Sequence, residues 1–391
     1  MSIPYLITFK PVGPFYFGTF KSFGEGFHAI SSPMPMQSTV LGCLRFVMVK
    51  QHGWIIKVPD QGFIPDFEKH KVDISGLTGD AKQVMLDSQE DKDFDFGSIR
   101  KVSPVFIVRQ DDGHTCPDDF LLHVPKDVYP PGEEKPPQLT LITYDINTEA
   151  WTGGLSGINK HAALSHHDPK KYPADHYGGQ AFWQSYLKGE RKLPYFGDYD
   201  AGRIFINDLK EGIARENRQA KDEAFYVKEA YRMYDDYAFG VIVHFDDDKA
   251  PKNELVKLGG DGSSFWMNVS KIDDYHLTIY QNHPIIRRFL TLDDIGDLPM
   301  LFADKRAESD KLVAVSETFL NGTIEGVEHA VIPELHCNRM LQWGGLKTES
   351  FRGIPDGSVV YPLKNTKING ALNPRLMKIG YNWWLKTEKG F

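Results

Sequence analysis

Residues 258–266, LGGDGSSFW, carry the glycine pattern whose chemistry is easiest to state. Gly259, Gly260 and Gly262 can adopt positive φ angles, so that successive backbone N–H groups point to one side and bind an anion such as phosphate. Asp-Gly is also the standard signal of a hairpin turn, and that interpretation stays open. The pattern GxxxxGK[ST] does not occur in the chain, which excludes a phosphate-binding loop of that type.

Three further glycine clusters, FGEGF (23–27), TGGLSG (152–157) and WGGLK (343–347), stand beside aromatic residues. Backbone donors next to aromatic rings suit a single-stranded nucleic acid, because its bases stack and its phosphates accept hydrogen bonds. Ordinary turns beside core aromatics give the same pattern, so both interpretations are kept. Isolated basic residues occur near these clusters: Lys21, Lys160, Lys347 and Arg352.

The residue types of common catalytic and metal sites do not form convincing constellations. Four histidines fall within residues 161–176, but the adjacent His166 and His167 lack the i, i+4 spacing that offers two ligands to one metal. Cys43 lies on the apolar face of an expected helix, and no GxSxG pattern occurs. We therefore expect no metal, no cofactor and no small-molecule substrate.

The first fifty residues predict the elements that hold these groups. Residues 5–9 form an apolar strand, and an aromatic, glycine-rich loop follows it. The next helix begins at Gln37 or Ser38, because apolar residues then recur at helical spacing, and Gly53 ends it. A strand, a long loop and a buried helix are typical of the opening of a βα unit.

The remaining pattern favours α+β domains with antiparallel sheets. Residues 54–103 read as a solvated insertion, residues 284–290 as a short helix, and residues 151–200 as irregular. We place a domain boundary near residue 200, which gives domains 1–200 and 201–391. Strands are expected at 104–109, 139–144, 203–207, 224–232 paired with 237–245, 255–258, 265–269, 276–280, 358–363 and 376–385.

The composition of the chain excludes several classes of protein. The 391 residues carry 45 Lys and Arg against 53 Asp and Glu, a formal charge of −8, which argues against a free, nonspecific nucleic-acid binder. No apolar stretch is long enough to span a membrane, and the N-terminal MSIPYLITFK does not resemble a signal peptide. The three cysteines form no pair at zinc-site spacing, and we expect a reducing cytoplasm.

Several ordered motifs resemble the CRISPR RAMP proteins, and most closely the third Cmr subunit of type III-B effector complexes. The segment 224–243 is similar to the "LY-x-x-E-x-x-R-L" element of that family, and LGGDG (258–262) is similar to its "LGGEG". QWGGLK (342–347) and IPDGSVVYPL (354–363) resemble its C-terminal glycine-rich elements. The family pattern "P-P-S-T-x-x-G-x-x-R" is filled by Pro33, Pro35, Ser38, Thr39, Gly42 and Arg45. The long insertions around 54–103 and 145–200, and Asp261 in place of Glu, depart from the family.

The resemblance implies two ferredoxin-like (RRM-like) domains with long loop insertions. It implies a non-catalytic subunit that holds the 5′ repeat-derived tag of the crRNA and bridges the large polymerase-like subunit to the backbone RAMP subunit in antiviral defence. The insertion 145–200 is a candidate thumb over the guide, so deletion of 151–180 should weaken assembly. The expected RNA-binding residues are Lys21, Ser38, Thr39, Arg45, Lys160, His161, Gly259, Gly260 and Gly262.

Three alternatives remain open from the sequence. One is a RAMP endoribonuclease that processes pre-crRNA, with His28 as general base and Lys21 or Tyr16 assisting. Another is the equivalent subunit of a type III-A or III-D complex, and the last is an unrelated α+β binding protein. Helix capping by Ser38 and Thr39 and a surface salt bridge of Arg45 are the structural alternatives to RNA contact.

Overall fold

The structure is a computed structural model that describes most of residues 2–110 and 200–291 and less of residues 111–199 and 292–391. All statements below concern the residues that it describes. They are residues 2–18, 28–59, 62–79, 96–110, 119–129, 140–141, 176–190, 193–194, 200–216, 219–246, 249–260, 262–291, 311–320, 327–331, 336–341, 347–362 and 374–387.

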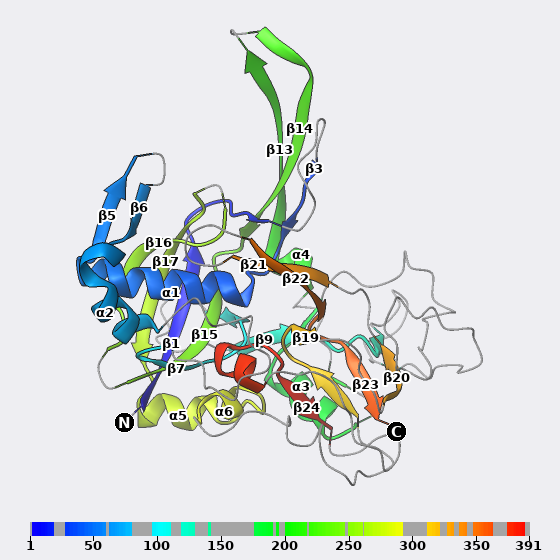
Figure 1. Cartoon of the computed structure of the whole chain (residues 1–391). Coiled ribbons are helices and arrows are strands. Elements are labelled where there is room, and N and C mark those ends of the chain that lie inside the picture. The colour runs from blue at the N-terminus through cyan, green and yellow to red at the C-terminus, as the bar shows by residue number, and fades with distance from the viewer. Residues whose placement is uncertain are drawn as a thin grey trace.

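An eight-stranded antiparallel sheet forms the centre of the molecule (Figure 1). Its strand order is β12-β9-β8-β15-β1-β17-β16, and β7 also pairs with β15. The N-terminal strand lies between β15 and β17, which come more than two hundred residues later. The strands are β1 (Ser2–Pro11), β7 (Ile99–Val102), β8 (Phe106–Arg109), β9 (Asp119–His123), β12 (Tyr177–Gly178), β15 (Tyr237–Asp246), β16 (Glu254–Lys257) and β17 (Ser264–Lys271).

Side-chain alternation in this sheet builds a buried core on each face. In β1, Ile7 and Phe9 belong to one buried cluster and Leu6 belongs to the other. Helix α1 (Gln37–Gln51) packs Val40 and Leu44 against the first face. The second face is covered by α3 (Gln180–Leu187), α5 (Asp274–Tyr280), α6 (Ile286–Phe289) and strands near the C-terminus.

A long two-stranded hairpin leaves the body of the molecule, as Figure 1 shows for the green strands β13 and β14. Strand β13 (Phe205–Glu216) follows the short helix α4 (Ala201–Ile204), and β14 (Gln219–Met233) returns to the sheet. The short strand β3 (His28–Ala29) pairs with β14 in parallel. Phe15 of the N-terminal aromatic loop also forms a backbone bridge with Tyr231 of β14, so this loop lies beside the base of the hairpin.

Smaller elements complete the fold. The described remainder consists of β2 (Phe17–Gly18) with β4 (Ser31–Ser32), β5 (Ile55–Val58) with β6 (Gly62–Pro65), α2 (Phe67–Thr78), β10 (Val128–Tyr129) with β11 (Thr140–Leu141), a sheet of β18 (Leu312–Ala314), β20 (Val327–Val331), β23 (Val359–Pro362) and β24 (Trp384–Lys386), a sheet of β19 (Thr318–Leu320), β21 (His336–Leu341) and β22 (Lys347–Ile354), and the 3₁₀ helix Pro374–Ile379.

The structure corrects several sequence-based expectations. Residues 54–103 are not wholly irregular, because they hold β5, β6, α2 and β7. Residues 224–232 and 237–245 are strands joined by a turn, but β14 pairs with β13 and β15 pairs within the main sheet. Residues 276–280 are helical because Asp273 accepts the His276 backbone N–H and caps α5. Of the expected strand 376–385, residues 376–379 belong to a 3₁₀ helix and only Trp384 and Leu385 belong to a strand, β24.

Other expectations are confirmed. The strand at 5–9, the helix that begins at Gln37 and ends before Gly53, and the antiparallel pairing all appear in the structure. The architecture is a mixed one with a large antiparallel sheet and few helices, and two ferredoxin-like domains remain a prediction. The main sheet takes strands from both sides of residue 200, and the division into 1–200 and 201–391 also stays a prediction. No helix in the described ranges has the length and apolarity needed to cross a membrane.

Candidate nucleic-acid interface

The glycine segment 258–263 is a hairpin turn between β16 and β17. Gly259 and Gly262 have φ angles of +88° and +70°, in the left-handed region that favours glycine. The Leu258 N–H donates to the Ser263 carbonyl at 3.2 Å, and the Ser263 N–H donates to the Gly260 carbonyl at 3.1 Å. The turn interpretation is therefore confirmed for this segment.

This turn packs directly on the N-terminal aromatic loop. The Gly260 N–H donates to the Tyr16 carbonyl at 2.9 Å, and the Tyr16 N–H donates to Ser263 Oγ at 2.9 Å. A Cβ atom at Gly259 would lie 2.6 Å from the Tyr16 carbonyl oxygen and from Phe17 Cδ1. Glycine is required because two backbones meet here. The N–H of Gly260 is used inside the protein rather than presented to an anion.

Positively charged lysine side chains lie near Tyr16 and the turn. The Lys228 Nζ lies 4.4 Å from the centroid of the half-buried Tyr16 ring, in cation–π geometry. Lys210 lies directly opposite Lys228 in the β13–β14 register. Burial, together with the nearby Lys210, lowers the pKa of Lys228, and burial raises the pKa of Tyr16. Lys257 Nζ lies 3.9 Å from the position of a Cβ at Gly262.

Buried aromatic rings hold the loop in place. The ring centroids of Phe15 and Phe17 lie 5.1 Å apart. Both rings contact Phe239 and Phe265 from the main sheet. Ser31 Oγ accepts the Phe17 N–H at 2.9 Å, which joins β2 to β4. The aromatic residues Phe15 and Phe17 are thus core side chains, whereas Tyr16 faces the lysines.

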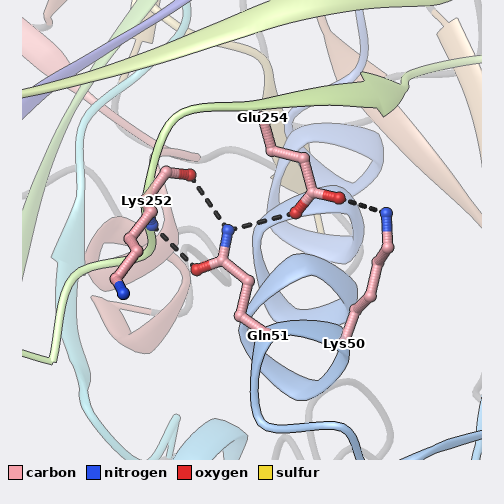
Figure 2. A network of polar contacts seen from close by, with 4 residues as sticks. All are labelled: Lys50, Gln51, Lys252 and Glu254. Atoms are coloured by element: carbon pink, nitrogen blue, oxygen red, sulfur yellow. Dashed lines mark hydrogen bonds and ion pairs between the residues drawn. The ribbon is translucent and has the colours of Figure 1, made fainter.

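A polar network fixes β16 to the end of α1 (Figure 2). Gln51 Nε2 donates to the Lys252 carbonyl at 3.0 Å and to Glu254 Oε2 at 3.1 Å, and Gln51 Oε1 accepts the Lys252 N–H at 2.8 Å. Lys50 forms an ion pair with Glu254. Burial disfavours the charged carboxylate, but the hydrogen bonds from Lys50 and Gln51 outweigh it and lower the pKa of Glu254. The network sets the position of the strand that carries the glycine turn.

The predicted residues of α1 contact other segments. The Ser38 N–H donates to the Tyr381 hydroxyl at 2.9 Å, and Thr39 lies one residue further into the helix. Met36, not Ser38, is the N-cap, and it makes no side-chain capping bond. Arg45 is 5% exposed and donates from Nη2 to the Gly79 carbonyl at 3.0 Å, where α2 ends. The contact of Arg45 organises a helix end and is not the surface salt bridge considered above.

Three predicted residues lie outside the described part of the chain: Lys21, Lys160 and His161. Residues 151–175 of the segment 151–180 lie outside it as well. Among the described residues no group of three His, Cys, Asp or Glu side chains is arranged to hold a metal.

The sequence-based reasoning did not select Lys210, Lys228 or Lys257. Lys257 directly precedes the LGGDG segment, and this adjacency in the sequence could have indicated it as a candidate residue. Lys210 and Lys228 become neighbours only through the pairing of β13 with β14, whereas the sequence pattern pairs residues 224–232 with 237–245. Tyr16 was noted only as an assisting group of the ribonuclease alternative.

A protein-family model matches residues 7–282 of the chain, and its description is a CRISPR-associated protein. These residues include the aromatic loop, the hairpin and the glycine turn. The chain belongs to the Cas_Cmr3 family, and the resemblance to the third Cmr subunit is confirmed. As a member of this family it is a type III CRISPR effector subunit.

The solved structures to which this chain is similar include chains of Cmr and Csm complexes. A chain of the type III-B Cmr-beta complex bound to cognate target RNA is 13% identical, with a TM-score of 0.44 and coverage of 97% of this chain and 95% of that chain. In the complex that also holds AMPPnP the identity is 15% and the TM-score 0.42, with the same coverage. A chain of the Csm1–Csm4 cassette with pppApA is 12% identical, with a TM-score of 0.34 and coverage of 99% and 95%. No curated protein matches this chain significantly.

Proposed function

We propose that this subunit binds the 5′ repeat-derived tag of a crRNA and joins the large polymerase-like subunit to the backbone RAMP subunit, without cleaving RNA itself. Membership of the Cas_Cmr3 family supports a role within a type III effector complex. The observation that carries RNA binding is the group formed by Tyr16, Lys228 and the 258–263 turn. It places an aromatic ring, a partly desolvated cation and an exposed glycine backbone on one surface.

The chemistry of this group matches a short single strand of RNA. A splayed base stacks on an aromatic ring, and lysine ammonium groups neutralise the phosphates on either side. Gly259 and Gly262 are exposed, so a nucleotide backbone can approach the turn closely. The net charge of −8 then matters little, because only a few local cations are needed. RNA binding by the chain alone is expected to be weak and strongly salt-sensitive, with firm retention only in the assembly.

Two substitutions test the proposal. Tyr16→Ala removes the ring, and we expect crRNA affinity of the reconstituted complex to fall about 5- to 150-fold in filter binding, the range of one lost base stack. Lys228→Gln removes one cation, and it should reduce the slope of log affinity against log salt by about 0.7. Lys188→Gln is the matched control, because Lys188 is an exposed lysine at the end of α3.

Wild-type affinity and salt dependence in both variants would contradict the proposed RNA surface. The proposed lack of cleavage is tested separately by incubating the purified protein with repeat RNA without metal. A single cut within the repeat that His28→Ala abolishes would favour the ribonuclease alternative instead. The structure places the His28 backbone opposite Val227 on β14, one residue before Lys228.

A further inference from the structure

A second surface lies at the open edge of the main sheet, on β1, β17 and β16. Trp266 of β17 is 47% exposed, and the register places it between Lys10 of β1 and Leu255 of β16. Leu255 is itself 52% exposed. A tryptophan ring is thus displayed to solvent from a strand whose backbone is paired on both sides.

The sheet alternation explains why this tryptophan faces outward. Val256, Phe265 and Met267 point to the face covered by α1 and are buried there. Trp266 and Leu255 therefore lie on the opposite face, the one that Leu6 shares with α3, α5 and α6. Within the described residues, the buried cluster of that face includes no side chain from β16 or β17. The covering helices stop short of these strands.

The charges on this open face are positive. Lys10 lies directly across from Trp266, and Lys257 lies on β16 two residues from Leu255, on the same side. Both lysines are exposed. Glu254, the acidic residue of β16, belongs to the other face and pairs with Lys50 of α1, as Figure 2 shows. The described outward positions of β16 and β17 carry no acidic side chain.

We propose that Trp266 is a stacking platform for a nucleobase of single-stranded RNA, with Lys10 and Lys257 beside the flanking phosphates. An exposed indole between cations on a sheet is a surface that a base and its phosphates complement. This inference rests on the proposed function, because it extends the same RNA path. Lys257 connects the two surfaces, since its Nζ lies beside Gly262 of the glycine turn.

The positive charge favours RNA over a protein partner on this face. A protein docking surface typically has a polar rim, and its centre is depleted of charged residues. Here Lys10 is the immediate neighbour of the tryptophan, and both described charges are basic. RNA therefore satisfies the ring and the lysines together.

The test uses the full chain and a labelled single-stranded oligoribonucleotide at low salt, followed by fluorescence anisotropy. Trp266→Ala should weaken binding about 5- to 150-fold, while Trp266→Phe, which keeps a stacking ring, should stay within about threefold. Tyr275→Ala is the control, because Tyr275 is a 66% exposed aromatic residue on α5. In RNA that carries 5-iodouridine, light should also cross-link the base to Trp266, as mapped by mass spectrometry.

The outcomes separate this inference from the proposed function. If Trp266→Ala binds like the wild type while Tyr16→Ala and Lys228→Gln lose affinity, the platform is wrong and the proposed function stands. If none of the three loses affinity, alone or in the assembled complex, both are wrong. If Trp266→Ala keeps its RNA affinity but no longer co-purifies with other Cmr subunits, the surface binds protein and the inference is overturned.

Discussion

At the scale of single residues, Glu317 has the environment with the clearest consequence for stability. It lies between β18 and β19, and Gly353 leaves room for it, since a Cβ there would lie 2.7 Å from Glu317 Oε1. Burial, with a contribution from Asp356, raises the pKa of Glu317 to about 8. Asp356 also pairs with His123, with 3.2 Å between Asp356 Oδ2 and His123 Nδ1.

This carboxyl group should make stability depend on pH. Between its ordinary pKa of 4.5 and about 8, the folded protein holds a proton that the unfolded chain has released. The free energy of unfolding therefore falls as the pH rises through this window. Glu317→Gln should flatten that slope and be more stable than the wild type at the upper end, as measured by urea unfolding at several pH values. An unchanged slope would show that the group is ionised in the folded protein.

At the scale of elements, the 258–263 turn couples the β16–β17 hairpin to the aromatic loop. Two hydrogen bonds join the turn to Tyr16, and the network of Figure 2 holds the other end of β16. Contacts at both ends of the four-residue strand β16 thus fix the position of the turn. This element carries both the glycines and Lys257.

Substitution of its glycines should separate strain from close packing. Gly259→Ala combines a left-handed φ with a clash against the Tyr16 backbone, and we expect a loss of about 2–4 kcal/mol in unfolding free energy with weaker RNA binding. Gly262→Ala has a similar backbone strain but only an ordinary contact with Lys257 Nζ at 3.9 Å, so about 1 kcal/mol is expected. Urea unfolding of both variants measures the difference. Equal losses would mean that contact with Tyr16 contributes nothing.

At the scale of the whole molecule, one buried ion pair joins distant parts of the chain. Asp127 Oδ2 and Lys311 Nζ lie 2.7 Å apart, and both side chains are fully buried. The hydroxyls of Tyr186 and Tyr361 each donate to Asp127 at 3.0 Å. Lys311 also lies 4.3 Å from the Tyr186 ring centroid. The network ties α3, β23 and the segments before β10 and β18 into one core.

Loss of one charge from this pair should destabilise the entire fold. Asp127→Asn leaves Lys311 buried without its counter-charge, and we expect a loss of about 3–5 kcal/mol in unfolding free energy. The double variant Asp127→Asn with Lys311→Met removes both charges and should recover much of that loss. Urea unfolding checks both variants. A double variant as unstable as the single one would show that packing, not the unpaired charge, causes the effect.

The sequence by itself determined the local elements and the family. Apolar spacing predicted α1, and Gly53 marked its end, because these are local properties of the chain. Ordered motifs indicated the third Cmr subunit, which the family match confirmed. Local patterns failed at residues 276–280, where apolar residues suggested a strand and the cap by Asp273 makes a helix.

Only the tertiary structure decided which residues share a surface. Tyr16 and Ser263 bond across 247 positions of sequence. Lys228 lies against Tyr16 because the neighbouring Phe15 forms a backbone bridge with Tyr231 of β14. Arg45, selected from its motif, is instead buried against the end of α2. Such contacts depend on strand pairing between distant segments, and no local propensity encodes that pairing. The formal charge could be counted from the sequence, but the position of the few lysines that matter could not.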